Sequence, residues 1–340
     1  MRPSTPQWWY RRDRARYSAT RLMLTPLSWV WTWVTARRLS QGRSADPGVP
    51  VICVGNLTMG GSGKTPVVRA LAVRLRDLGM ETHIVTRGFG GRQSGPVRVD
   101  AGQHTAAEMG DEAVMLAADG PVWVSRDRAA GAAAAVAAGA QIVVLDDGHQ
   151  NPGIAKTLSI IVVDGETRDG EWPFGDGGTF PAGPMREPLG SGLGRADLVV
   201  LILPADLKSA DPDLISLLQG KPVLIARFAP LGPPPDGPQL AFAGIGKPWK
   251  MERALRAAGC DLADFAPLPN HAAISERILG FLARRAAGLG AGLLTSEKDW
   301  VRLSPAWRAK VKFWPISVQF EDAAALDAWL RPFAPKHYAP

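Results

Sequence analysis

Cysteine is scarce in this chain, and its scarcity excludes two classes of small protein. Cys53 and Cys260 are the only cysteines among 340 residues. Two isolated cysteines form neither a disulfide framework nor a zinc-binding pattern. Cys53 lies in an apolar run, where a small buried side chain is expected. The composition therefore favours a reducing, cytosolic compartment.

A long uninterrupted apolar run is also missing. The stretch from Leu22 to Val34 has thirteen residues, contains Pro26 and lies between Arg21 and Arg37. A helix needs about 20 apolar residues to cross a bilayer, so this stretch is too short. A charged segment before an apolar run resembles a secretory signal in outline, but no small-residue cleavage site follows.

Charge of one sign is not in excess over most of the chain. Residues 1–48 contain nine Arg and two Asp, so they carry the whole formal net charge of +7. The balanced remainder argues against a nucleic-acid-binding surface. Five of the twelve tryptophans also fall within residues 1–48. Because Trp and Arg are typical of segments at an anionic membrane surface, we predict that residues 1–48 associate with one. The alternative is a helix packed on the protein's own core.

A glycine-rich stretch follows and organises the rest of the chain. Val51–Val54 is an apolar, largely β-branched run, G-G-S-G-K-T follows at 60–65, and a helical pattern covers Pro66–Leu78. Strand, glycine-rich loop and helix in this order are typical of a phosphate-binding loop, or P-loop. Lys64 is expected to reach the β- and γ-phosphates of ATP, and the hydroxyl of Thr65 is expected to bind Mg²⁺.

The strict P-loop pattern requires a glycine where this chain has Thr58. An ordinary glycine-rich turn is the alternative, but the flanking strand and helix favour a nucleotide site. The residues predicted to bind ATP are Thr58, Met59, Gly60, Gly61, Ser62, Gly63, Lys64 and Thr65.

Two acidic patterns lie downstream of the P-loop. Asp146 and Asp147 end the apolar run Gln141–Leu145, an arrangement that holds Mg²⁺ in P-loop proteins, although two Asp before a Gly also occur in simple turns. Asp111 and Glu112 open a helical pattern, where acidic residues cap helices more often than they catalyse reactions.

Alternating strand and helix patterns predict an α/β fold with a parallel, P-loop-type sheet flanked by helices. We expect three parts: residues 1–48 as the membrane-associating segment, 49–195 as the P-loop domain, and 196–340 as a second, smaller α/β lobe. An alternative is that the terminal helix of the second lobe packs back on the P-loop domain.

Three further side chains are candidates for the site. Arg87 follows the strand pattern Thr82–Arg87, and Arg186 lies in an irregular segment rich in Gly and Pro; both are suited to phosphate, and both have solvated loop charges as the alternative. His271 follows two prolines at the start of a helical pattern. A lone His is usually structural, but its side chain suits proton transfer near neutral pH.

Eight motifs in consistent order resemble the tetraacyldisaccharide 4′-kinase family of lipid A biosynthesis. They span residues from about 20 to 330. The motifs are G-N-L-T-M-G-G-S-G-K-T-P at the P-loop, T-R-G-F-G-G at 86–91, G-D-E at 110–112, D-D-G-H-Q-N at 146–151, P-A-G-P-M-R-E at 181–187, A-G-I-G at 243–246, P-N-H at 269–271 and T-S-E-K-D at 295–299.

The resemblance implies ATP-dependent phosphorylation of the 4′-hydroxyl of a tetraacylated glucosamine disaccharide 1-phosphate. It also implies two α/β lobes, of which the P-loop lobe is larger, and a peripheral location on the cytoplasmic face of the inner membrane through an N-terminal helix. Asp111 resembles the family's catalytic base and His271 its paired histidine. Glu112 and Asp147 resemble the carboxylates on the magnesium side. The protein is expected to act as a monomer.

The chain departs from the family pattern at three positions. His149 and Asn151 stand where the family usually has Phe and His, and P-N-H replaces the commoner P-D-H. Asn151 does not titrate and is excluded from proton transfer. Two other classes remain as alternatives: a P-loop switch or chaperone, against which the lack of an N-K-x-D guanine motif counts, and a membrane-recruited ATP-binding regulator without chemistry.

Overall fold

The computed structural model describes residues 6–12, 18–218, 220–270 and 274–335. Its larger sheet contains β1 (Val51–Gly55), β2 (Thr82–Thr86), β3 (Val97–Arg98), β4 (Val122–Val124), β5 (Ile142–Asp146), β6 (Leu158–Asp164), β7 (Leu198–Leu203), β8 (Val223–Pro230) and β13 (Ile316–Phe320). Its smaller sheet contains β9 (Gln239–Ala243), β10 (Leu262–Pro267), β11 (Gly292–Ser296) and β12 (Val311–Trp314).

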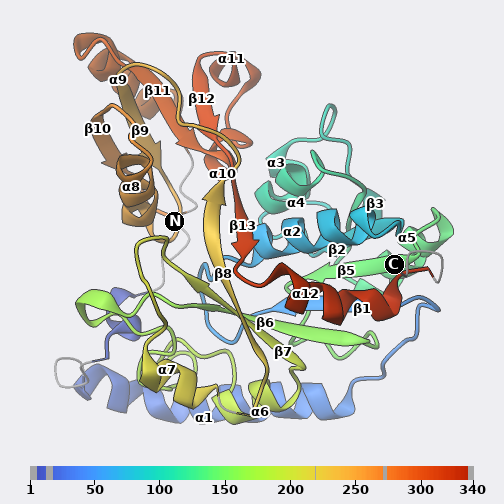
Figure 1. Cartoon of the computed structure of the whole chain (residues 1–340). Helices are drawn as coiled ribbons and strands as arrows, with labels where there is room; N and C mark the ends of the chain where they lie inside the picture. The colour runs from blue at the N-terminus through green and yellow to red at the C-terminus, as the bar shows by residue number, and fades with distance from the viewer. Residues whose placement is uncertain (1–5, 13–17, 219, 271–273, 336–340) are drawn as a thin grey trace.

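The helices connect these strands and cover the sheets (Figure 1). The α-helices are α1 (Ser18–Gln41), α2 (Lys64–Asp77), α3 (Ala106–Met109), α4 (Asp111–Leu116), α5 (Arg128–Ala137), α6 (Leu189–Gly194), α7 (Pro212–Leu217), α8 (Pro248–Ala257), α9 (Glu276–Gly288), α10 (Glu297–Trp300), α11 (Pro305–Arg308) and α12 (Ala323–Leu330). The described residues also contain the short 3₁₀ helices η1 (Gln7–Tyr10), η3 (Arg168–Gly170) and η4 (Arg331–Phe333).

The strand order confirms the predicted α/β fold with a mostly parallel sheet. The larger sheet runs β13-β8-β7-β6-β1-β5-β2-β4-β3, and only the pairs β13–β8 and β3–β4 within it are antiparallel. The smaller sheet runs β10-β9-β11-β12 and is parallel throughout. The P-loop strand β1 lies between β6 and β5, so its loop emerges in the middle of the carboxyl edge, where α/β sheets place ligands.

Burial on both faces explains why the central strands are continuous apolar runs. Ile52 and Val54 of β1 point into a core shared with α2, whereas Val51 and Cys53 point into a second core beneath α5. A third core lies under α6 and α7. The smaller sheet is covered by α9 on one face and by α8 on the other. Each lobe therefore has its own hydrophobic core.

The boundary between the lobes differs from the one expected at residue 196. Strands β7 and β8 belong to the larger sheet, and the smaller lobe begins after the Pro-rich loop at 230–238. The chain then returns to the larger sheet, because β13 pairs with β8. Helix α12 packs Leu326 and Leu330 into the core of the larger lobe. The proline-rich loop separates the two sheets, whereas residue 196 lies in a short turn between α6 and β7 within the larger lobe.

Helix α1 lies along the larger lobe, at the bottom of Figure 1. One side of it contacts the protein: Ser28 Oγ donates to the Thr179 carbonyl at 2.8 Å, and Trp31 Nε1 donates to the Arg186 carbonyl at 2.8 Å. Its other side exposes apolar residues, with Trp29 70% and Trp33 62% exposed. No helix among the described residues combines the length and the apolar character that crossing a membrane requires.

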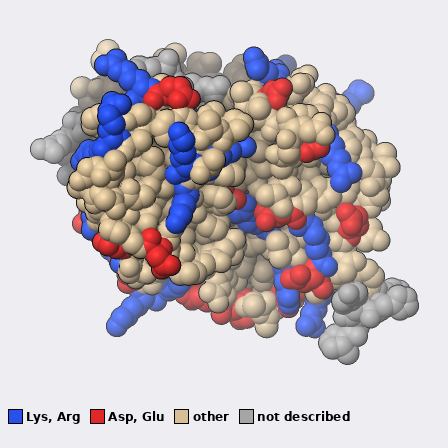
Figure 2. Space-filling view, turned by 90° about the horizontal axis from the view of Figure 1, so that it is seen from above, with Lys and Arg blue, Asp and Glu red and all other residues tan. Residues whose placement is uncertain are grey.

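Charges are mixed on the face shown in Figure 2. Basic and acidic side chains of the described residues are interspersed there, and neither sign forms a broad patch on that face. This pattern agrees with the balanced charge of the sequence after residue 48.

Candidate active site

Two glycines shape the P-loop between β1 and α2. Gly60 and Gly63 have φ angles of 87° and 84°, a left-handed conformation that disfavours other residues. A Cβ at Gly63 would lie 2.7 Å from Ile202 Cδ1. No side chain in the described part of the chain caps the start of α2, so the first N–H groups of this helix are available to an anion. The loop and the helix together have the backbone features that phosphate binding requires.

The segment around Arg186 forms hydrogen bonds with the P-loop and the residues before it. Met59 N donates to the Pro184 carbonyl at 2.7 Å, and Arg186 N donates to the Leu57 carbonyl at 2.8 Å. The guanidinium of Arg186 donates through Nε to the Thr58 carbonyl at 2.9 Å. The irregular, Gly- and Pro-rich segment is therefore part of the site, and Arg186 lies against the P-loop itself.

Lys64 begins α2, and its ammonium group points at polar partners. Its Nζ donates to Asn56 Oδ1 at 3.1 Å and lies 3.7 Å from Asp147 Oδ1. Burial lowers the pKa of Lys64 below its ordinary value, although Asp147 opposes this effect. Asn56 in turn donates to the Thr58 carbonyl at 2.9 Å. The sequence analysis did not identify Asn56 as a site residue. Its position between the strand and the P-loop could have indicated that it belongs to the site.

The two aspartates after β5 have different environments. Burial alone would raise the pKa of Asp147, but Lys64 and Arg186 outweigh it and hold this pKa well below its usual range. Arg186 donates to Asp147 Oδ1 at 2.7 Å. Burial, together with the charges of Glu112 and Asp147, raises the pKa of Asp146 to about 7. Asp147 is thus a stable anion. Burial and the neighbouring negative charges make ionisation of Asp146 less favourable.

These carboxylates fit a magnesium ion that arrives with nucleotide. Asp146 Oδ1 is buried and has no hydrogen-bond partner among the described residues. The same residues contain no group of three His, Cys, Asp or Glu side chains placed to hold a metal. Protein sites for Mg·ATP commonly use one or two carboxylates and complete the coordination with phosphates and water. The donor set suits that kind of ion.

The acidic pair Asp111–Glu112 is positioned by two packed glycine loops. Gly110 has a φ angle of 92°, and a Cβ there would lie 2.7 Å from the Phe89 carbonyl oxygen. A Cβ at Gly88 would lie 2.7 Å from the Met109 carbonyl oxygen. The T-R-G-F-G-G and G-D-E motifs therefore pack directly on each other. Asp111, only 7% exposed, begins α4 and accepts the Glu112 N–H at 3.0 Å.

Lys298 of the T-S-E-K-D motif reaches this pair from the smaller lobe. Its Nζ donates to Glu112 Oε1 at 2.8 Å and lies 4.0 Å from Asp111 Oδ2. Burial alone would lower the pKa of Lys298, but Glu112 and then Asp111 outweigh it, so this pKa is above its ordinary value. The T-S-E-K-D motif alone did not predict a role for Lys298.

Two other predicted residues have simpler surroundings. Arg87 is exposed in the loop after β2. Burial is the main cause that lowers the pKa of Arg128, and the nearby charge of Arg87 lowers this pKa further. Arg128 is itself buried at the start of α5 and donates to the Ser125 carbonyl at 2.7 Å. His271 lies outside the described residues.

The two departures after Asp147 have structural surroundings. His149 is buried and has Nε2 3.0 Å from the Gly192 carbonyl oxygen; burial and Arg195 lower the pKa of His149 to about 4. It is therefore neutral at pH 7. Asn151 Oδ1 accepts the Gly153 N–H at 2.7 Å, a local turn contact.

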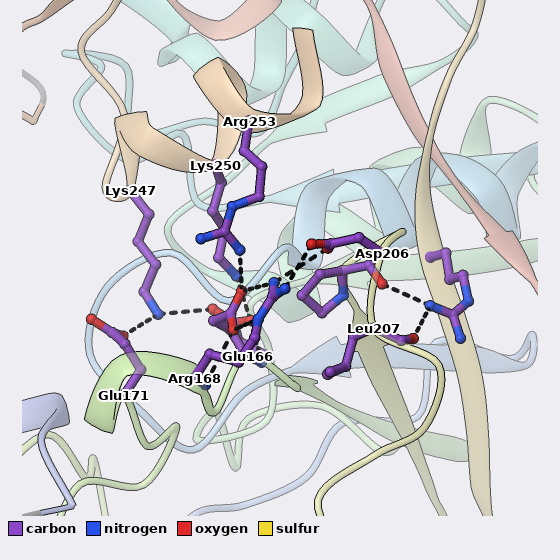
Figure 3. A network of polar contacts seen from close by, with 11 residues as sticks. Glu166, Arg168, Glu171, Asp206, Leu207, Lys247, Lys250 and Arg253 are labelled. Atoms are coloured by element: carbon purple, nitrogen blue, oxygen red, sulfur yellow. Dashed lines mark hydrogen bonds and ion pairs between the residues drawn. The ribbon is translucent and has the colours of Figure 1, made fainter. Parts of the chain in front are cut away.

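Ion pairs join the smaller lobe to the larger lobe near the end of β6. In Figure 3, Lys247, Lys250 and Arg253, at and in α8, point toward acidic side chains of the larger lobe. Lys250 Nζ lies 2.6 Å from Asp164 Oδ1 at the end of β6, and Lys247 Nζ lies 2.8 Å from Glu171 Oε2. These contacts hold the smaller lobe over the carboxyl edge of the larger sheet.

Comparisons with known proteins identify the family of the chain. The family model described as tetraacyldisaccharide-1-P 4′-kinase matches residues 20–334. Tetraacyldisaccharide 4′-kinase of Phenylobacterium zucineum is 63% identical, with 96% of this chain and 98% of that protein covered. The corresponding protein of Caulobacter sp. (strain K31) is 58% identical, with 97% and 98% covered.

A solved structure shares the fold. The crystal structure of LpxK from Aquifex aeolicus in complex with ATP has a TM-score of 0.71 and 24% sequence identity, and the match covers 93% of this chain and 100% of that one. The match of the family model over most of the chain and the high identity to curated relatives show that this chain belongs to the tetraacyldisaccharide-1-P 4′-kinase family.

Proposed function

We propose that the protein transfers the γ-phosphate of ATP to the 4′-hydroxyl of a tetraacyl glucosamine disaccharide 1-phosphate, a step of lipid A biosynthesis. The names of its relatives support this activity. The observation that carries it is the convergence of two motifs. The charge of Glu112 is near enough to act on the pKa of both Lys64 and Asp146, which supports a shared site for the G-D-E motif and the P-loop. A phosphate-binding lysine and a carboxylate pair are what transfer from nucleotide to hydroxyl requires.

The P-loop residues 58–65 bind the phosphates of ATP, and the ammonium of Lys64 faces the β- and γ-phosphates. Thr65, Glu112 and Asp147 would hold Mg²⁺, which when bound neutralises charge on the phosphates. The 4′-oxygen of the sugar forms a bond to the γ-phosphorus while the bond from that phosphorus to the bridging oxygen breaks, and ADP leaves with the electron pair. Asp111 accepts the hydroxyl proton, and His271 supports Asp111.

Arg87 and Arg186 bind the anionic groups of the lipid substrate in this proposal. Arg186 lies between the P-loop and Asp147, so its contact is with the reacting end of the substrate. Arg87 is exposed beside the loop that packs on the G-D-E motif, which gives it access to a substrate entering from solvent. Their fork-shaped guanidinium groups suit phosphate.

The protein acts as a monomer at the cytoplasmic face of the inner membrane and has no nucleic-acid partner. Helix α1 carries exposed apolar residues on the side away from its contacts with the larger lobe: Leu22, Met23, Leu27, Trp29, Val30 and Trp33. Because four acyl chains keep the substrate in the bilayer, this helix brings the enzyme to the membrane, where it lies in the interface. The arginines of residues 1–48 attract anionic lipid.

Replacing Trp29 and Trp33 together by Ser tests this membrane contact. We expect the partition constant for anionic phosphatidylglycerol vesicles to fall by about tenfold or more, since two exposed aromatic side chains no longer enter the interface. A vesicle sedimentation assay measures it. The matched control replaces Phe281 and Leu289, which are 55% and 45% exposed at the smaller lobe, by Ser. Equal partition of wild type and the Trp29/Trp33 variant would contradict the proposal.

The proposed activity is tested with purified protein, Mg·ATP and detergent-dispersed tetraacyldisaccharide 1-phosphate. Mass spectrometry is expected to show a product heavier by one phosphoryl group, formed only with ATP present. ATP binding without any such product would instead favour a switch or regulator.

A further inference from the structure

Each charged residue of α10 contacts a different structural element. Glu297 accepts two hydrogen bonds from Arg69 of α2, both at 2.7 Å. Asp299 Oδ2 accepts the Gly244 N–H at 2.8 Å, in the loop after β9. Lys298 pairs with Glu112 at the start of α4. This short helix of the smaller lobe therefore contacts the P-loop helix, the loop after β9 and the acidic pair.

The loop after β9 lies close to the P-loop. A Cβ at Gly246 would be 3.8 Å from the Gly61 nitrogen. Since Asp299 fixes Gly244 of the same loop, the position of α10 is linked to the position of the smaller lobe against the P-loop. Lys298 thus reaches the acidic pair only when the smaller lobe is in place.

The location of Lys298 matches an electrostatic need of the site. Asp111 and Glu112 are adjacent, and the charges of Glu112 and Asp147 both act on Asp146. Like charges in one site repel each other and push the side chains apart. Lys64 and Arg186 face Asp147. Lys298 supplies positive charge on the other side, where its side chain is 23% exposed and within 4.0 Å of both Asp111 and Glu112.

We propose that Lys298 is a positioning residue for phosphoryl transfer: from the smaller lobe it orients Asp111 and Glu112 toward the phosphate site of the larger lobe. The proposal rests on the proposed kinase function for its kinetic consequence. Its electrostatic consequence, a weaker pull of the acidic pair on Mg²⁺ while Lys298 is present, does not depend on turnover. Both consequences are measurable.

A purely structural role is the competing explanation, because Lys298 also joins the two lobes. Glu297 separates the two explanations. It lies next to Lys298 on the same helix and joins the same lobes through Arg69, but its ion pair is with Arg69 rather than with the acidic pair. A structural role predicts similar losses from Glu297→Gln and Lys298→Met, whereas a positioning role predicts different ones.

The kinetic test compares Lys298→Met, Lys298→Arg, Glu297→Gln and the exposed-surface control Lys310→Met. For Lys298→Met we expect kcat to fall about 100-fold, the effect of misplacing a reacting group, while KM for ATP changes less than about threefold. Lys298→Arg is expected to recover at least about tenfold of that loss, since it restores the charge. Glu297→Gln is expected to lower the midpoint of thermal unfolding with kcat within about threefold of wild type.

The binding test uses Mg²⁺ alone, titrated while the thermal midpoint is followed. Removal of the ammonium makes the acidic site one charge more negative, so Lys298→Met is expected to reach half of its Mg²⁺-induced shift at about three- to tenfold lower Mg²⁺ than wild type. Lack of product from wild type would reject the kinase function and leave this titration to decide the electrostatic part. An unchanged Mg²⁺ midpoint, or equal kcat losses in Lys298→Met and Glu297→Gln, would overturn the proposal.

Discussion

Asp111→Asn is expected to lower kcat by about 10³-fold, equivalent to about 4 kcal/mol of transition-state stabilisation. The amide does not accept the proton of the sugar hydroxyl, so the reaction loses its base. The amide oxygen keeps the ability to accept the Glu112 N–H, which Asp111 Oδ1 accepts at 3.0 Å, so the start of α4 is preserved. Steady-state kinetics with saturating lipid and ATP measure this loss.

Mg·ATP affinity provides the internal check for this variant. It is expected to stay within about threefold of wild type, because Asp111 acts on the hydroxyl rather than on the nucleotide. The matched control is Asp100→Asn, which alters an exposed aspartate that accepts the Gly102 N–H in a surface turn. A kcat for Asp111→Asn within tenfold of wild type would show that another group removes the proton.

Lys64→Met is expected to lower kcat/KM for ATP by about 10²- to 10³-fold, the usual cost of removing one preorganised charge that stabilises the transition state. The methionine retains much of the side-chain volume but not the ammonium group that lies beside Asn56 and Asp147. Both nucleotide affinity and kcat are expected to fall, because the γ-phosphate is contacted before and during transfer.

Isothermal titration with ATP and initial-rate kinetics separate the two contributions of Lys64. Lys208→Met, at an exposed position after β7, is the control and is expected to match wild type. If Lys64→Met retained wild-type kcat/KM, the stretch at residues 60–65 would be an ordinary glycine-rich turn rather than a phosphate site.

The larger lobe is largely predictable from local sequence. The apolar runs at 51–54 and 158–164 form β1 and β6, because strands buried on both faces leave an uninterrupted apolar pattern. The arrangement of the strands after residue 203 is not predictable from local sequence. Strand β8 was not predicted, and β13 pairs with it across the whole smaller lobe, from Ile316 back to Pro230. No local pattern specifies so distant a pairing.

Part of the candidate site is also predictable from local sequence, and part of it is not. The P-loop residues 58–65 are contiguous, so one stretch of sequence predicts them together. Glu112 and Lys298 are 186 positions apart, and their ion pair depends on how the lobes meet. Helix α1 illustrates an intermediate case: its apolar stretch was recognised, but the helix continues to Gln41 because Arg37 and Arg38 do not disrupt a helix.

The position of the transferred phosphate tests the central claim most directly. The protein would be incubated with Mg·ATP labelled in the γ-phosphoryl group and with tetraacyldisaccharide 1-phosphate, and the lipid product analysed by two-dimensional ¹H–³¹P correlation. The account predicts one new phosphomonoester, labelled and coupled to the proton on C4′. A phosphate on another hydroxyl, or release of labelled inorganic phosphate with the lipid unchanged, would contradict it.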